Sequence, residues 1–212
     1  MSNKLDNIDF YMVTDSSLSK NGIISDVENA LRAGCKIVQY REKYKSTREM
    51  IKEAKHLKQI CDGRATFLIN DRVDIALAVD ADGVHIGKED MPFETVKTLL
   101  GKDKIIGQTV HNLEEAFEAV KLGVDYIGLA PIFKTDTKKD AHKPCGIKMI
   151  KKIRKEVNLP IVAVGGIDKE NIKEVIEAGA DSAVSIKAVL GSDDIYSEIT
   201  DFIRIIKGCK SR

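Results

Sequence analysis

The sequence predicts a (β/α)₈ barrel, the TIM-barrel class of α/β fold, and three observations carry this prediction. Eight short apolar runs of strand-like composition recur along the chain, and segments with the 3.6-residue period of amphipathic helices lie between them. The runs are continuous rather than alternately polar, which is typical of parallel strands covered on both faces. Eight such units in 212 residues fit one compact barrel with short loops. We therefore expect a single domain over residues 1–212.

The expected strands are the apolar runs at 10–14, 36–40, 66–70, 83–87, 104–109, 126–130, 160–166 and 182–186. Helical periodicity is clearest at 23–34, 112–123 and 171–180. Glycines stand at or near the ends of these helices, as they often do past a helix C-terminus: Gly34, Gly123 and Gly179. A doubly wound open sheet is the alternative fold, but the turn "TDSSLSKNG" after the first strand lacks the glycine pattern that this fold requires.

Charge and cysteine usage exclude several classes of function. Lys and Arg number 34 and Asp and Glu 33, so the net charge of +1 gives no support to nucleic-acid or membrane binding driven by bulk charge. The four cysteines form no C-x-x-C pair, which argues against a local zinc site and favours reduced thiols. The first residues contain no long apolar segment, and no stretch approaches a membrane span. We expect a cytoplasmic protein that acts on small molecules.

The second expected strand ends in residues suited to an anion. In such a barrel the active-site residues lie at the carboxyl ends of the strands. Gln39 and Arg41 lie two residues apart, so they share one face of the strand, and Lys43 continues that face into the loop. An amide and two cations aimed together suit a phosphate or diphosphate, because Arg grips two oxygens and Lys adds a point charge. A strand end with ordinary surface charges is the alternative interpretation.

Acidic residues follow the next two strands. Asn70 and Asp71 come directly after the third strand, and Asp90 follows the fourth. Two carboxylates on neighbouring strand ends suit Mg²⁺, which takes few protein ligands together with phosphate oxygens of a substrate. Each of these residues also has a structural interpretation as a cap of the helix that follows it, the second helix beginning near Pro92.

The remaining strands end in hydroxyl, lysine and glycine residues. Thr109 closes the fifth strand, and "KTDTKKD" after the sixth supplies Thr135, Thr137 and Lys138. Gly165–Gly166 follow the seventh strand and "SIKAVLG" the eighth, where many barrels bind a phosphate through backbone N–H groups. A solvated loop and a tight glycine turn are the alternatives.

None of the four histidines completes a catalytic arrangement. His85 lies within the fourth strand, where a core histidine is the simpler interpretation, and His111 precedes a helix that Asn112 is expected to cap. The sequence offers no H-E-x-x-H motif, no Ser/His/Asp set and no obvious nucleophilic cysteine. Two anion-binding regions, one of them with Mg²⁺, instead suggest a transfer reaction in which pyrophosphate leaves.

Four segments in register resemble the thiamine-phosphate synthase family: "QYREK", "INDRVDIALAVDADGVHIGKED", "PIFKTDTKKD" and "VAVGGI". Their order and spacing match from about residue 11 to about residue 191. The resemblance implies a (β/α)₈ barrel that joins hydroxymethylpyrimidine diphosphate to a thiazole phosphate with the help of Mg²⁺, giving thiamine phosphate and pyrophosphate. It also implies a dissociative mechanism, in which pyrophosphate departs before the thiazole nitrogen attacks a pyrimidine-stabilised carbocation.

The resemblance further implies a role for each matching residue. It assigns the pyrimidine diphosphate to Gln39, Tyr40, Arg41, Glu42, Lys43, Asn70, Thr109 and Lys138. It assigns Mg²⁺ to Asp71 and Asp90, and the thiazole phosphate to Thr135, Asp136, Thr137, Gly166, Ile186 and Lys187. Three of these residues would be catalytic by neutralising the leaving pyrophosphate: Arg41, Lys43 and Lys138.

One residue departs from the family pattern, and several alternative functions are to be compared with the synthase. Lys187 stands where the family has a small Ser, and it either adds charge to the thiazole-phosphate site or crowds it. The nearest rival is the thiazole tautomerase branch, an isomerase that tends to lose the aspartate matching Asp71 and has a His where this chain has Pro131. A non-catalytic phosphate-binding barrel is the rival from another class. An epimerase-like barrel would need paired His and Asp ligands. A homo-oligomer stays open, because the sequence does not give the number of subunits.

Overall fold

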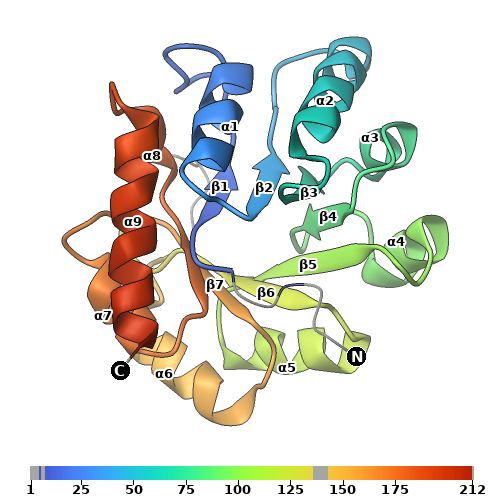
Figure 1. Ribbon diagram of the computed structural model, residues 1–212. Helices are drawn as coiled ribbons and strands as arrows, with labels where there is room; N and C mark the ends of the chain where they lie inside the picture. The colour runs from blue at the N-terminus through green and yellow to red at the C-terminus, as the bar shows by residue number, and fades with distance from the viewer. Residues whose placement is uncertain (1–4, 6–7, 136–142, 212) are drawn as a thin grey trace.

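The chain forms a parallel barrel inside a ring of helices (Figure 1). The computed structural model describes residue 5 and residues 8–135 and 143–211. Within them, eight strands are ordered β1 to β8 as in the sequence, and each pairs in parallel with the next. A parallel bridge between Phe10 and Ala183 joins the start of β1 to β8. The predicted fold class is therefore confirmed.

The strands occupy the predicted apolar runs, and β3 has the predicted bounds. They are β1 (Tyr11–Val13), β2 (Ile37–Tyr40), β3 (Thr66–Asn70), β4 (Gly83–Ile86), β5 (Ile105–Val110), β6 (Tyr126–Leu129), β7 (Ile161–Val164) and β8 (Ser182–Val184). A helix follows each strand: α1 (Ile23–Arg32), α2 (Thr47–Cys61), α3 (Val73–Ala78), α4 (Phe93–Leu100), α5 (Leu113–Leu122), α6 (Gly146–Glu156), α7 (Ile172–Glu177) and α8 (Ile186–Leu190). A last helix, α9 (Ile195–Lys210), packs against α1, α7 and α8.

Local signals fix several helix ends. Ser46 and Glu49 form a reciprocal capping box at the start of α2, and the Asn112 side chain caps α5 as predicted. Such caps satisfy backbone N–H groups that the first helical turn leaves without partners. Gly123 ends α5 in the left-handed conformation, with φ 83°. The helix boundaries therefore follow from capping chemistry as well as from periodicity.

Two apolar layers result from the alternation of side chains along the strands. The inner layer fills the barrel with Tyr11, Val13, Ile37, Leu68, Ile105, Tyr126, Val162 and Val184. The larger outer layer lies between the strands and the helices, and includes Val38, Tyr40, Phe67 and Ile69. Because residues two apart share a face, Gln39 follows Ile37 toward the barrel interior, whereas Tyr40 follows Val38 toward the helices.

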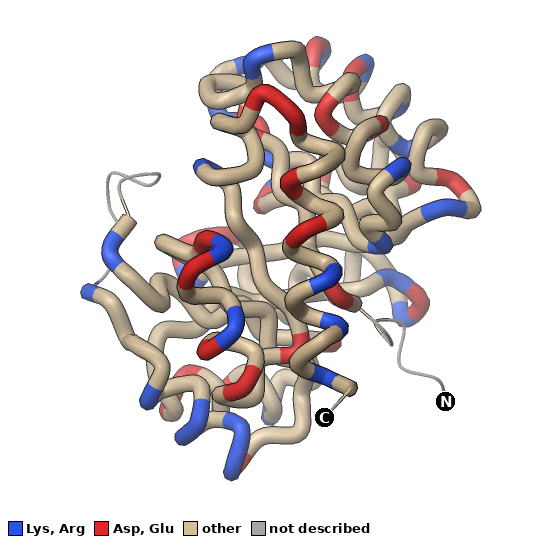
Figure 2. The backbone as a smooth tube through the Cα atoms, turned by 60° about the vertical axis from the view of Figure 1, so that its left-hand side comes forward, with Lys and Arg blue, Asp and Glu red and all other residues tan. Residues whose placement is uncertain are grey.

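The outer surface carries charges of both signs. Lys, Arg, Asp and Glu are interspersed along the chain (Figure 2), as the near-zero net charge leads one to expect.

Within the described ranges, none of the helices combines the length and the apolar content that spanning a membrane requires.

Two glycines make room for rings inside the barrel. A Cβ atom placed on Gly107 of β5 would lie 2.1 Å from Cζ of Tyr126, and one on Gly128 of β6 would lie 2.8 Å from Cε1 of His85. No real Cβ contact is that short at a ring buried in a packed interior. These positions therefore require glycine because of the neighbouring rings.

Gly107→Ala should lower the free energy of unfolding by about 1–3 kcal/mol, because the added methyl group overpacks the interior against Tyr126. Gly208→Ala is the matched control, since nothing lies within 4 Å of that position in α9 and alanine favours a helix by about 0.5–1 kcal/mol. Denaturant unfolding of both variants measures the difference. Equal changes in stability would contradict the packing account.

Candidate active site

The carboxyl ends of β1 to β5 are joined by polar side chains. Thr14, just past β1, accepts a hydrogen bond from the backbone N–H of Arg41 at 2.9 Å and donates one to its carbonyl at 3.2 Å. Asn70 of β3 donates to the carbonyl of His85 on β4 at 3.5 Å, and Nε2 of His85 lies 2.9 Å from Oγ1 of Thr109 on β5. The structure thus brings the predicted residues of β2, β3 and β5 to one end of the barrel.

A buried carboxylate that sequence reasoning missed holds Arg41 in place. Nη1 of Arg41 donates to Oδ2 of Asp15 at 2.5 Å, and the two side chains are only 13% and 7% exposed. Asp15 is itself oriented by the N–H and hydroxyl of Ser17, at 3.1 and 2.5 Å. Its position in the sequence could have identified it as a site residue, because Asp15 directly follows the first apolar run as Asp71 follows the third.

The guanidinium of Arg41 has a buried donor that the described residues leave unsatisfied. Its buried Nε has no hydrogen-bond partner among the described residues. Leaving a buried donor without a partner costs about 1–3 kcal/mol, and more for a charged group. An anion bound at this point would remove that cost.

Lys43 and Asp71 form the second ion pair of the site. Nζ of Lys43 donates to Oδ2 of Asp71 at 2.5 Å, and the other carboxylate oxygen accepts a hydrogen bond from the Asn70 side chain. Asp71 has φ 59°, a conformation that non-glycine residues rarely adopt and that often marks a functional site. The alternative interpretation of Asn70 and Asp71 as helix caps is wrong, because α3 begins after Arg72 without a side-chain cap.

Asp90 and Asp71 form an acidic pair. Oδ2 of Asp90 accepts from the N–H of Gly87 at 2.7 Å and closes the turn after β4. It does not cap α4, whose N-cap is Pro92 without a side-chain bond. Burial raises the pKa of Asp90, and a hydrogen bond with the carboxyl of Asp71 raises it further. Two adjacent carboxylates of this kind stay charged together only when a cation compensates them.

The acidic pair fits Mg²⁺. It offers only oxygen donors, and Mg²⁺ needs no more than one or two protein carboxylates when phosphate oxygens and water complete its shell. Over the ranges that the structure describes, no group of three or more His, Cys, Asp or Glu side chains comes together. Asp71 and Asp90 are the residues that would hold the ion.

The side chains of two residues of the "QYREK" segment are bonded within the protein, so the structure gives no support to their side chains as ligand contacts. Tyr40 is fully buried on the outer face of β2, and its hydroxyl donates to Glu53 of α2 at 2.8 Å. The Glu42 side chain is also buried and accepts the backbone N–H groups of Lys43 and Tyr44, both at 2.8 Å. Alternation along β2 directs Tyr40 toward the helices, and Glu42, in the loop that follows, holds the backbone of that loop.

The predicted thiazole-phosphate residues are described only in part. Asp136, Thr137 and Lys138 lie outside the described residues, and Thr135 is half-buried just before them. Ile186 begins α8, and Lys187 follows it as an exposed residue.

The glycine pair after β7 allows two loops to approach closely. Gly165 and Gly166 have φ 102° and 64°. A Cβ atom on Gly166 would lie 2.7 Å from the carbonyl oxygen of Lys134 and 2.8 Å from Cβ of Phe133, so the loop after β6 packs directly on this turn. The tight-turn interpretation therefore holds, and it places Gly166 beside the segment that leads into Thr135.

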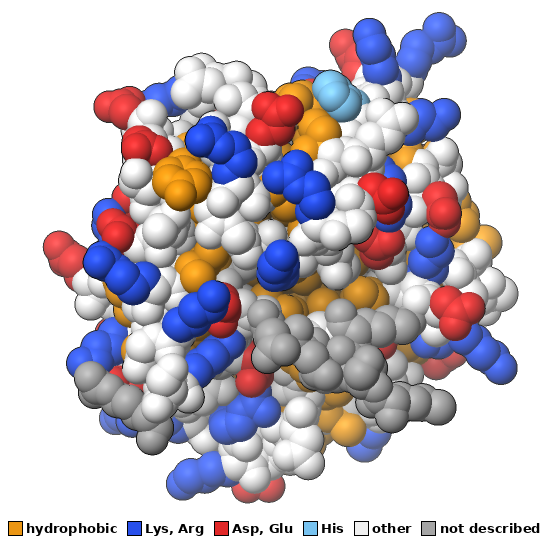
Figure 3. All heavy atoms as spheres, in the orientation of Figure 1, with side chains coloured by type: hydrophobic (Ala, Val, Ile, Leu, Met, Phe, Trp, Pro, Cys, Tyr) orange, Lys and Arg blue, Asp and Glu red, His pale blue; other side chains and the backbone are white. Residues whose placement is uncertain are grey.

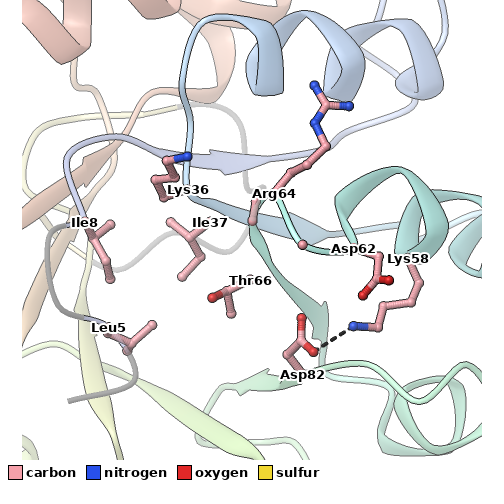
Figure 4. Close-up of a pocket in the computed structure, with 11 residues that line it drawn as sticks. Leu5, Ile8, Lys36, Ile37, Lys58, Asp62, Arg64, Thr66 and Asp82 are labelled. Carbon is pink, nitrogen blue, oxygen red and sulfur yellow. Dashed lines mark hydrogen bonds and ion pairs between the residues drawn. The ribbon is translucent and has the colours of Figure 1, made fainter. Parts of the chain in front are cut away.

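A hollow of about 570 Å³ lies at the opposite, amino end of the strands (Figure 4). Its charged lining residues are Lys36, Lys58, Asp62, Arg64 and Asp82. Lys58 donates to Asp82 at 2.7 Å, and Asp82 also accepts the backbone N–H of Phe67 at 2.7 Å, so these charges hold strands and helix together. On the face of the molecule shown in Figure 3, positively and negatively charged side chains also lie among hydrophobic ones. Sequence reasoning did not place a site at this end.

Comparisons with known proteins show the family of the chain. The family model for thiamine monophosphate synthase matches residues 10–189. The chain is 60% identical over 206 residues to the thiamine-phosphate synthase of Methanosarcina mazei, covering 97% of this chain and 86% of that protein. It is 58% identical to that of Methanosarcina barkeri, with 97% and 94% covered. It is also similar to the solved thiamine phosphate pyrophosphorylase from Pyrococcus furiosus, with TM-score 0.88, 39% identity, and 95% and 96% of the two chains covered.

Asp71→Asn should lower the pKa of Asp90, because it removes the neighbouring negative charge that raises this pKa. Burial is the larger cause and remains, so the pKa should stay above the ordinary aspartate value. NMR titration of the side-chain carboxyl carbon measures it. Asp74→Asn is the matched control, since Asp74 is 57% exposed and pairs with Arg72. An unchanged or higher pKa of Asp90 in Asp71→Asn would show that the two carboxyls do not interact.

Proposed function

The chain belongs to the thiamine monophosphate synthase family, and from this premise we propose how its site carries out the reaction. It is an enzyme of thiamine biosynthesis, a transferase. The proposed substrates are hydroxymethylpyrimidine diphosphate and hydroxyethylthiazole phosphate, and the products are thiamine phosphate and pyrophosphate. The observation that carries the proposal is the buried Nε of Arg41, which finds no partner in the described part of the chain. Arg41 follows the same strand as Lys43, and Lys43 pairs with Asp71 of the acidic pair.

The diphosphate is proposed to bind between the cations of β2 and the acidic pair. Arg41 offers the Nε–H that the described residues leave without a partner, and Lys43 offers an ammonium group that Asp71 already orients. When bound, Mg²⁺ would neutralise further charge on the diphosphate from its place at Asp71 and Asp90. Lys138 is proposed as a third cation on the same group, in line with the family resemblance.

The reaction is proposed to begin with cleavage of the bond between the pyrimidine methylene carbon and the diphosphate oxygen. The bonding electrons leave with pyrophosphate, and the cationic side chains stabilise the charge that develops there. The thiazole nitrogen then uses its lone pair to form the carbon–nitrogen bond with the methylene cation. Catalysis consists of charge neutralisation and positioning, so no side-chain nucleophile is required.

The thiazole phosphate is proposed to bind at the loops after β6, β7 and β8. Gly166 stands next to the chain that leads to Thr135, and both carry roles implied by the family resemblance, as do Asp136 and Thr137. The backbone N–H groups of Ile186 and Lys187 would complete the site. Lys187 is exposed, so the replacement of the family's serine does not bury a charge, which supports its being tolerated.

The acidic pair favours the synthase over the thiazole tautomerase branch. Asp71, which that branch tends to lose, is present here and contacts Asp90 and Lys43. Small-molecule substrates fit the proposal. A cytoplasmic location also fits it, because all four cysteines are free thiols, as is usual in a reducing compartment.

A pyrophosphate-release assay tests the proposed function. Purified protein receives the pyrimidine diphosphate and the thiazole phosphate, separately and together, with and without Mg²⁺. Release that requires both substrates and Mg²⁺ is the expected result. Interconversion of thiazole isomers without pyrophosphate release would assign the chain to the tautomerase branch. Absence of turnover by the wild-type protein would leave a phosphate-binding barrel.

Arg41→Lys should reduce kcat/KM by about 10- to 100-fold, because it removes the forked donor, and hydrogen bonds to charged groups contribute about 1.5–3 kcal/mol each. Lysine keeps a cation beside the buried Asp15, so the variant avoids the larger loss of stability that alanine would cause. Arg64→Lys at the exposed amino end is the control and should leave kcat/KM unchanged. A fall in activity no greater than the loss of folded protein would remove Arg41 from the diphosphate site.

A further inference from the structure

A chain of five hydrogen-bonding side chains, here called the interior relay, crosses the barrel beneath the proposed site. Nε2 of Gln39 donates to the hydroxyl of Tyr11 at 2.7 Å, and that hydroxyl lies 2.7 Å from the hydroxyl of Tyr126. The Tyr126 hydroxyl lies 2.9 Å from Nδ1 of His85, whose Nε2 lies 2.9 Å from Oγ1 of Thr109. Its two ends are expected pyrimidine-site residues, whereas the three residues between them have no role so far.

The barrel is shaped around this relay. Tyr11 and Tyr126 are 1% and 0% exposed, so their hydroxyl groups find partners only inside the protein. The ring of Tyr126 needs the space left by Gly107, and the ring of His85 needs the space left by Gly128. Two buried phenols, a half-buried imidazole and two space-making glycines are a costly way to fill an interior that apolar side chains fill elsewhere.

Donor and acceptor accounting gives the relay one direction. Burial raises the pKa values of Tyr11 and Tyr126, so both phenols keep their protons. Tyr11 accepts from Gln39, so we assign its own proton to the contact with the oxygen of Tyr126. We then assign the proton of Tyr126 to the contact with Nδ1 of His85, an arrangement that requires a His85 tautomer with its proton on Nε2.

The relay thereby presents a hydrogen-bond donor at one end and a hydrogen-bond acceptor at the other, which is called its polarity below. In this tautomer Nε2–H of His85 donates to Thr109 Oγ1, so the hydroxyl proton of Thr109 points away from His85. At the other end, one N–H of the Gln39 amide donates to Tyr11, and this bond fixes which way the amide faces and so where its accepting Oε1 lies. An aminopyrimidine matches this pattern, because its amino group donates and its ring nitrogens accept.

We propose that Tyr11, Tyr126 and His85 are positioning residues that fix this polarity and thereby select an aminopyrimidine over an oxopyrimidine. This inference rests on the proposed function for the identity of the substrate. An oxo group in place of the amino group would put a carbonyl oxygen against Oε1 of Gln39. The amide can turn to accommodate it only by breaking its bond to Tyr11, and the relay resists that turn.

Tyr126→Phe tests the proposal by cutting the relay at its centre. Without the Tyr126 hydroxyl, Tyr11 is able to donate back to a turned Gln39, and His85 loses the donor that fixes its tautomer. The measurement is kcat/KM for the aminopyrimidine diphosphate divided by kcat/KM for its 4-oxo analogue. Tyr126→Phe should lower this ratio about tenfold or more, since sites that bind a substrate polar group discriminate strongly against its mismatch.

Tyr40→Phe is the matched control for this ratio. It also removes a buried tyrosine hydroxyl, but one that faces the helices and bonds to Glu53 outside the site. Its selectivity ratio should equal that of the wild type even if its stability falls. A ratio in Tyr126→Phe as high as in the wild type would overturn the proposal.

A second measurement does not depend on activity. Nitrogen NMR of ligand-free wild-type protein, with the signals of His85 assigned from their loss in His85→Asn, should show a protonated Nε2 and an unprotonated Nδ1. The opposite tautomer, or an imidazolium, would overturn the relay. If neither pyrimidine is turned over, the proposed function fails, while the His85 tautomer still decides whether the relay exists.

Discussion

The ion pair between Arg41 and Asp15 is the interaction on which the rest of the site depends. It joins the ends of β1 and β2 in a place where both side chains are largely removed from water, so losing either partner would leave an uncompensated charge. The Lys43–Asp71 pair makes the same kind of connection between β2 and β3. Both cations are therefore oriented before any ligand arrives. A preorganised site of this kind spends little binding energy on ordering its own side chains.

The two ends of the barrel use charge differently. At the amino end, Lys58 and Asp82 satisfy each other and the backbone of β3, which serves stability. At the carboxyl end, the Nε of Arg41 and the paired carboxylates of Asp71 and Asp90 are incompletely compensated by the described residues. Incomplete compensation favours a ligand that brings both negative charge and a divalent cation. We therefore place the proposed chemistry where the strands end rather than at the hollow of the amino end.

Much of this was predictable from the sequence because it follows from local rules. Alternation along a strand placed Gln39 and Arg41 on one face, and continuous apolar runs indicated a parallel sheet. The Arg41–Asp15 pair and the Tyr11–Tyr126 contact could not be predicted in this way, because they join residues far apart in the chain. Asp71 and Asp90 had the local features of helix caps, and only the observed helix starts separate the two interpretations. Tyr40 shows the limit of assigning a whole motif, since its neighbours face the other side of the strand.

The most direct test of the central claim is a crystal structure of the protein with pyrophosphate and Mg²⁺. The account predicts that pyrophosphate contacts the Nε and Nη atoms of Arg41 and the ammonium of Lys43, with Mg²⁺ bound by Asp71 and Asp90. Arg41 should keep its bond to Asp15 in that complex. Pyrophosphate bound instead at the amino end, against Lys36 and Arg64, would contradict the account. So would pyrophosphate at Arg41 with no cation at the acidic pair.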